Sequence, residues 1–225
     1  FSTVCDQMRR IAEVFSINSD VPMFLFNVPT ACRIPSAPKL YLSELRRLGR
    51  FLERLGGCSP TPQRLAEVMF HYDCQRAQLR ALQGRLSARR YSEAIAQFHL
   101  KGSVNAESGA EEGTAGGVPL ALVGGPMLAH HFRLFDMIEE AGGVVTLDGT
   151  TSGERTLLDP FDPDRVRADP LAELAEAYLR IPEAFRRPND GLYHWLKRTI
   201  VQRSVRGIIF WRYLWCDTWR AETQR

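Results

Sequence analysis

The sequence predicts an α/β protein with parallel sheets, arranged as two lobes that are joined by helices and a glycine-rich linker. Three observations support this fold class. Short apolar runs of strand length alternate with amphipathic stretches of helical length. The second half follows a strand–helix–strand order: VPLALVGGP, then MLAHHFRLFDMIEEAGG, then VVTLDG. Between the halves, GSVNAESGAEEGTAGG is small, polar and glycine-rich, as is typical of a linker.

The first half contains one predicted strand among helices. The run VPMFLFNVP is bounded by prolines and has the length of a buried parallel strand. A helix is expected before it, from 6 to about 15, and another after it, from 38 to 55, which a Gly-Gly pair ends. Thr61 and Pro62 then have the residue types of a helix start, and we expect a helix to about 86 and another over 91–98.

The second half contains a βαβ unit, so its two strands should be parallel with a right-handed crossover. Helices are expected around 171–179 and 192–201, followed by the strand RGIIFW, whose end leads to Cys216. Ligands of such sheets bind beyond the carboxyl ends of the strands. The loops GGPM and DGTTSGERT, together with Cys216, should therefore share one edge, and Cys5 also follows a strand-like segment.

Composition bounds the class of protein. A net charge of +3 over 225 residues gives no basis for nucleic-acid binding, and no apolar run is long enough to span a membrane. The chain has five cysteines, an odd number, which favours a reducing compartment over a secreted disulfide scaffold. Together these features predict a soluble cytoplasmic protein without nucleic-acid or membrane partners. The chain starts in mid-lobe without Met, and we expect it to be truncated at both ends. The expected domains are 1–101 (the end of the first α/β lobe plus a helical connector), the linker 102–117, and an incomplete second lobe, 118–225.

A Cys-Asp pair stands near each end of the chain, at Cys5 and Cys216. Cysteine thiolates hold soft metals and iron–sulfur clusters, and the ligands need not be close in sequence. Free cysteine is also one of the most frequently buried residues, and two cysteines alone are too few to close a metal site, so the spacing by itself favours packing. We interpret the other cysteines as structural or incidental: Cys32, Cys58 and Cys74.

The loop DGTTSGERT carries the second candidate site. Hydroxyl groups and the guanidinium of Arg155 could hold a phosphate or carboxylate, with Thr151 beside it, although a solvated loop is the alternative interpretation. GGPM, followed by Asp148 in the next strand, lacks the glycines of a dinucleotide-binding turn. The adjacent His130 and His131 are expected to point to different sides of a helix and so form no metal pair.

The order of several motifs resembles a known family. STVCDQMRR and FLFNVP come first, followed by a leucine-rich helix that ends in Gly-Gly; ALVGGPM, IEEAGGVVTLDGTTSGERT and VRGIIFWRYLWCDTW follow in the second half. In this order the chain is similar to the 2-hydroxyacyl-CoA dehydratase family. That family also includes subunits of ATP-dependent benzoyl-CoA reductases and the double-cubane cluster proteins. The resemblance extends over essentially the whole chain.

The resemblance implies two flavodoxin-like (Rossmann-like) lobes with a 4Fe–4S cluster held by cysteines. Cys5 matches the ligand of the family's C-D-x-M-R-(R/K) motif, and Cys216 matches the ligand of its late C-D motif. A third ligand is then expected upstream of Phe1. Thr151 and Arg155 match the loop beside the cluster and are expected to contact substrate or support the cluster.

The implied activity is that of a lyase (a hydro-lyase) in anaerobic metabolism. An ATP-dependent iron–sulfur activator passes one low-potential electron to the cluster, which reduces an acyl-CoA thioester to a ketyl radical, and the 2-hydroxyl leaves as water. A homologous second subunit completes the enzyme. Two alternatives stay open: a subunit of a benzoyl-CoA reductase-like or double-cubane reductase, and a non-catalytic structural partner.

Overall fold

The computed structural model describes residues 1–104 and 116–223. The chain forms two compact units: Phe1–Met69 with Phe161–Asn189, and Phe70–Pro160 with Asp190–Arg225. Most of the predicted linker, residues 105–115, lies outside the described residues. The predicted domain boundaries at 101 and 118 stay a prediction.

The second unit contains a parallel three-stranded sheet, which confirms the α/β class. Its strands are β1 (Val118–Gly124), β2 (Gly143–Thr150) and β3 (Gly207–Trp211), in the order β2-β1-β3. Both pairings are parallel, as the strand–helix–strand pattern predicted for the first pair. The central strand β1 is buried over its last four residues, where it pairs with β2 on one side and with β3 on the other.

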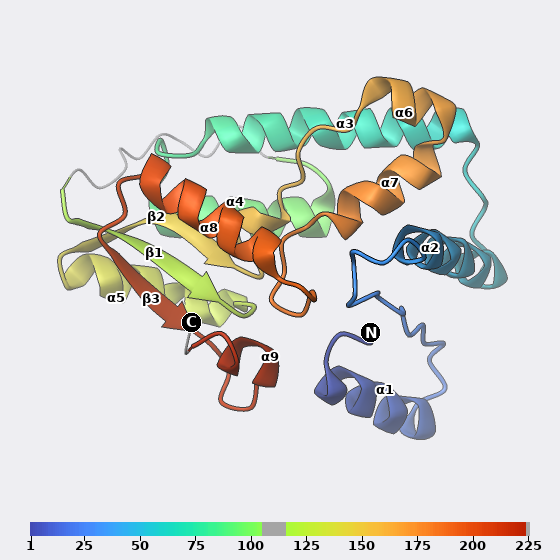
Figure 1. Ribbon diagram of the computed structural model, residues 1–225, viewed down its shortest axis with the longest axis horizontal. Helices are drawn as coiled ribbons and strands as arrows, with labels where there is room; N and C mark the ends of the chain where they lie inside the picture. The colour runs from blue at the N-terminus through green and yellow to red at the C-terminus, as the bar shows by residue number, and fades with distance from the viewer. Residues whose placement is uncertain (105–115, 224–225) are drawn as a thin grey trace. The chain divides into compact units, whose positions relative to one another are not determined.

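Helices cover both faces of this sheet (Figure 1). On one face lie α4 (Ala88–Lys101), the 3₁₀ turn η1 (Ala129–Phe132) and α5 (Arg133–Glu140). Their apolar side chains form a core with the sheet around Leu122, Phe135 and Val145. The helix α8 (Asp190–Gln202) crosses the other face, and the short α9 (Asp217–Arg220) follows β3.

The first unit is mainly helical in its described residues. It contains α1 (Asp6–Asn18), α2 (Ala37–Arg54), α6 (Pro163–Ala168) and α7 (Pro170–Leu179). Its core joins α2 to α7, with Ala37, Tyr41, Ala175 and Leu179 buried together. The chain leaves this unit within α3 (Pro62–Ala81), which is shorter than predicted because the turn at Gly84, with φ of 72°, follows it.

The strand predicted for VPMFLFNVP was wrong as an extended element. Its pairing consists of one parallel bridge, between Ser2 and Phe26. Two backbone hydrogen bonds support the bridge: Thr3 N–H donates to the Phe26 carbonyl at 3.0 Å, and Phe26 N–H donates to the Phe1 carbonyl at 2.9 Å. A regular strand needs a ladder of such bonds along its length, and in the described residues this segment makes a single isolated bridge.

Candidate functional site at the carboxyl edge of the sheet

The three strands of the second unit end side by side. Gly124, the last residue of β1, pairs with Thr150 at the end of β2 and with Trp211 at the end of β3. The Gly125 N–H donates to the Trp211 carbonyl at 2.9 Å, and the Thr151 N–H donates to the Gly124 carbonyl at 2.9 Å. The loops that follow these strands therefore share one edge, as parallel pairing predicted.

Gly124 is required by the close approach of β1 and β3. Its φ is 149°, and a Cβ at this position would lie 1.7 Å from the carbonyl oxygen of Trp211. Only glycine avoids both the strain and the collision. The first glycine of the Gly-Gly turn thus sets how closely the strand ends meet.

The buried side chain of Arg155 hydrogen-bonds to the ends of both β1 and β2. It belongs to η2 (Glu154–Thr156), and only 2% of the residue is exposed. Its Nε donates to the Gly149 carbonyl at 3.0 Å, and its Nη2 donates to Thr151 Oγ1 at 2.9 Å and to the Gly124 carbonyl at 3.5 Å. These contacts fix the loop; a contact of Thr151 or Arg155 with substrate stays a prediction.

The segment that carries Cys216 packs against Arg155. The indole ring of Trp219, in α9, lies 5.0 Å from the Arg155 guanidinium carbon, and Trp219 is buried. Cys216 immediately precedes α9, and its carbonyl accepts the Arg220 N–H at 2.8 Å. The second predicted ligand and the predicted substrate loop are therefore parts of one packed edge within the second unit.

Cys5 occupies the same local position in the first unit. It immediately precedes α1, its carbonyl accepts the Arg9 N–H at 3.1 Å, and it is half-buried and free, as is Cys216. The two cysteines lie in different units, so their meeting around one cluster stays a prediction. Over residues 1–104 and 116–223, no three His, Cys, Asp or Glu side chains are grouped to hold a metal ion.

The comparison with known families decides the identity of the chain. The family model of the 2-hydroxyglutaryl-CoA dehydratase D-component matches residues 1–225. The chain belongs to this family. It is accordingly a subunit of the 2-hydroxyacyl-CoA dehydratase type, as the motif order predicted. The search of curated protein sequences found no match to this chain. Within the part of the chain that the structure describes, none of the helices has both the length and the apolar character to cross a membrane.

Two polar groupings of this family member were missed from the sequence. The first is at His131, which lies in η1 rather than in a regular helix. Its ring centre is 3.9 Å from that of His130, so the expectation that the two rings diverge was wrong. The Leu128 N–H donates to His131 Nδ1 at 3.0 Å, and the Tyr213 hydroxyl lies 3.4 Å from the same atom. Burial, and then the neighbouring His130, hold the pKa of His131 below its ordinary value of 6.5.

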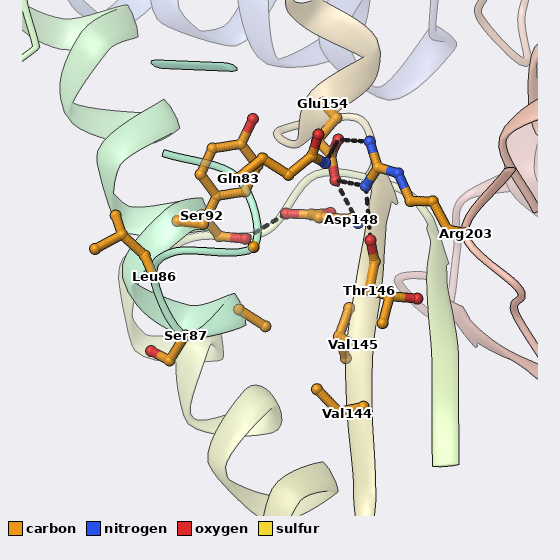
Figure 2. Close-up of a pocket in the computed structure, with 13 residues that line it drawn as sticks. Gln83, Leu86, Ser87, Ser92, Val144, Val145, Thr146, Asp148, Glu154 and Arg203 are labelled. Atoms are coloured by element: carbon orange, nitrogen blue, oxygen red, sulfur yellow. Dashed lines mark hydrogen bonds and ion pairs between the residues drawn. The ribbon is translucent and has the colours of Figure 1, made fainter. Parts of the chain in front are cut away.

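The second grouping lines a pocket of about 470 Å³ beside β2 (Figure 2). At its upper end the carboxylate of Glu154 accepts Arg203 Nη1 at 2.8 Å, Arg203 Nη2 at 2.5 Å and Gln83 Nε2 at 2.6 Å. Burial raises the pKa of Glu154, and the Arg203 guanidinium opposes this effect. Arg203 is 49 residues from Glu154 in sequence, so no local spacing could have predicted the pair.

Proposed function

We propose that the chain is the cluster-carrying subunit of a 2-hydroxyacyl-CoA dehydratase. Cys5 and Cys216 would hold a 4Fe–4S cluster together with a third thiolate, expected upstream of Phe1. When bound, the cluster would supply one low-potential electron to the thioester of an acyl-CoA. The 2-hydroxyl and a β-proton would then be lost together as water, and the electron would be recovered, so that the net reaction is a dehydration. The partners in this proposal are a homologous second subunit and an ATP-dependent iron–sulfur activator.

One observation carries the proposal beyond family membership. The segment with Cys216 covers, through Trp219, the arginine that holds the loop predicted to contact substrate. A site that moves an electron from a cluster to a thioester needs the ligand segment and the substrate loop at the same edge. The second unit provides this arrangement at the carboxyl end of its sheet, where parallel α/β sheets bind ligands.

The donor chemistry of the two cysteines fits such a cluster. Both are free thiols, both are half-buried, and neither side chain caps the helix that follows it. Iron–sulfur clusters take cysteine thiolates as ligands, and partial burial limits access of water to the centre. The fit is of residue type and environment, and the third thiolate is part of the proposal.

The residues of the second unit hold the edge in place in this proposal. Thr151 is half-buried, and its hydroxyl is fixed by two contacts: it accepts from Arg155 Nη2 at 2.9 Å and donates to the Gly124 carbonyl at 3.2 Å. Arg155 is buried, so it acts by fixing the loop. Thr151 is the residue of this pair that faces the acyl-CoA.

The test is iron content in the complete enzyme. The full-length subunit is prepared anaerobically with its partner subunit, and iron, sulfide and the EPR spectrum after reduction are measured for the wild type, Cys5→Ala and Cys216→Ala. Cys58→Ala is the matched control, because Cys58 is an exposed free thiol. We expect each ligand variant to lose iron and turnover while the control keeps both.

Two outcomes would contradict the proposal. A wild-type complex that stays free of iron after reconstitution would remove the cluster. Iron and turnover that are unchanged in both Cys5→Ala and Cys216→Ala would instead assign the chain to the alternative role of a structural partner.

A further inference from the structure

The strand β2 carries a β-bulge in front of the candidate site. Leu120 of β1 pairs with Val145, but the next residue, Ala121, pairs with Leu147, so Thr146 is an extra residue in β2. A bulge of this kind changes the direction of the side chains that follow it.

The bulge explains how Asp148 comes to face α4. Val145 packs in the core formed with α5 and α4, and Asp148, three residues later, accepts a hydrogen bond of 2.7 Å from Ser92 of α4. In a regular strand, residues three apart point to opposite faces. The extra residue Thr146 therefore turns a carboxylate toward the same face as Val145.

Asp148 then fixes the end of its own strand. Its Oδ1 accepts the Thr150 N–H at 3.1 Å and the Thr150 hydroxyl at 2.7 Å, and only 5% of the residue is exposed. The next residue after Thr150 is Thr151, at the candidate site. A buried carboxylate with three donors thus sets the conformation in which the chain enters the loop.

Glu154 and Arg203 fix the other end of the same loop. The pair is bidentate, and Arg203 Nη1 also donates to the Thr146 carbonyl at 2.6 Å, at the bulge itself. The Asp148 N–H donates to Glu154 at 3.1 Å. Figure 2 shows these side chains converging at one end of the pocket. Glu154 is followed by Arg155, so consecutive residues anchor η2 on the pocket side and on the site side.

We infer that Asp148, Glu154 and Arg203 are positioning residues, which hold residues 150–156 in the conformation that the acyl-CoA requires. The inference rests on the proposed function. A buried ion pair adds little net stability compared with apolar side chains of the same volume. Its directional hydrogen bonds do fix geometry. This network holds both ends of the loop that carries Thr151 and Arg155 at the candidate site.

Amide hydrogen exchange tests the positioning without using activity. We expect Glu154→Gln and Arg203→Met to increase the exchange rates of amides in 149–157 by about 10- to 100-fold, because charge-assisted hydrogen bonds are lost. Arg203→Lys keeps the charge without the bidentate geometry and should give an intermediate increase. Glu173→Gln is the control, because the Glu173 side chain, 1% exposed against 8% for Glu154, also pairs with an arginine, Arg165 at 2.8 Å, but lies in the first unit.

Kinetics of the assembled enzyme give the second measurement. Glu154→Gln should raise KM for the acyl-CoA about tenfold with iron content and the EPR spectrum unchanged, whereas Glu173→Gln should leave KM unchanged. Unchanged exchange and unchanged KM in both Glu154→Gln and Arg203→Met would overturn the inference and leave the cluster proposal intact. An iron-free wild type would overturn the cluster proposal, and the exchange rates would still decide whether the pair holds the loop.

Discussion

Replacing Gly124 with alanine is the most direct perturbation of the sheet edge. The new Cβ would lie 1.7 Å from the carbonyl oxygen of Trp211 and 2.7 Å from its carbonyl carbon. Both are backbone atoms, so no side-chain rotation can relieve the contact. The strands β1 and β3 must separate by roughly 1 Å or more, which breaks the hydrogen bond from Gly125 N–H to Trp211.

The loss of stability in Gly124→Ala is the sum of three free-energy contributions. Overpacking of a tightly packed site costs about 1–3 kcal/mol. The left-handed φ adds about 1 kcal/mol for a residue with a side chain, and a lost buried hydrogen bond adds about 1 kcal/mol. We expect Gly124→Ala to lower the free energy of unfolding by about 3–5 kcal/mol, which for a chain of this size lowers Tm by roughly 10 °C.

Thermal and urea unfolding, followed by circular dichroism, measure the effect. Gly49→Ala is the matched control, because Gly49 lies inside α2 and its added Cβ meets nothing within 4 Å. The control should raise the free energy of unfolding by about 0.5–1 kcal/mol, since alanine favours helix. A Gly124→Ala protein with the Tm of the wild type would refute the geometry of the edge, and with it the contact of Arg155 with the Gly124 carbonyl.

Three further predictions concern the same unit. Ser92→Ala should lower the free energy of unfolding by about 1–2 kcal/mol in urea, because buried Asp148 loses a donor. Trp219→Leu should lower it by about 2–3 kcal/mol, whereas Trp215→Leu, at a 68% exposed position, should be nearly neutral in the same thermal assay. Because the folded-state pKa of His131 is lowered, the stability it contributes is complete above its ordinary pKa of 6.5 and is lost as the pH falls below it. His131→Phe should reduce the pH dependence between about pH 7.5 and 5.5, and an unchanged dependence would contradict the role of Nδ1 as an acceptor.

The sequence predicted the sheet of the second unit well because its signals are local. β1 and β2 are short apolar runs that end in glycine or a polar loop, and the helix between them requires parallel pairing. Parallel pairing then places the strand ends together. The neighbourhood of Thr151, Arg155 and the Cys216 segment could therefore be anticipated without coordinates.

The missed features depend on contacts between distant segments. The bulge at Thr146 is visible only in the register with β1, and the sequence VVTLDG reads as a regular strand. The Glu154–Arg203 pair joins residues 49 positions apart. VPMFLFNVP has strand composition, but composition does not supply the neighbouring strands that a ladder needs.

The two Cys-Asp motifs share one local structure, and this separates the roles of their residues. In each, the cysteine is extended and directly precedes a helix whose first residue is the aspartate. Acidic residues are favoured in the first turn of a helix, so the helix start accounts for Asp6 and Asp217. It does not account for the cysteines, because Ser, Thr, Asp or Asn would cap these helices better and neither thiol does so. The helix start thus leaves Cys5 and Cys216 unexplained, and thiolate ligation, as proposed, supplies the missing reason for a sulfur at both positions.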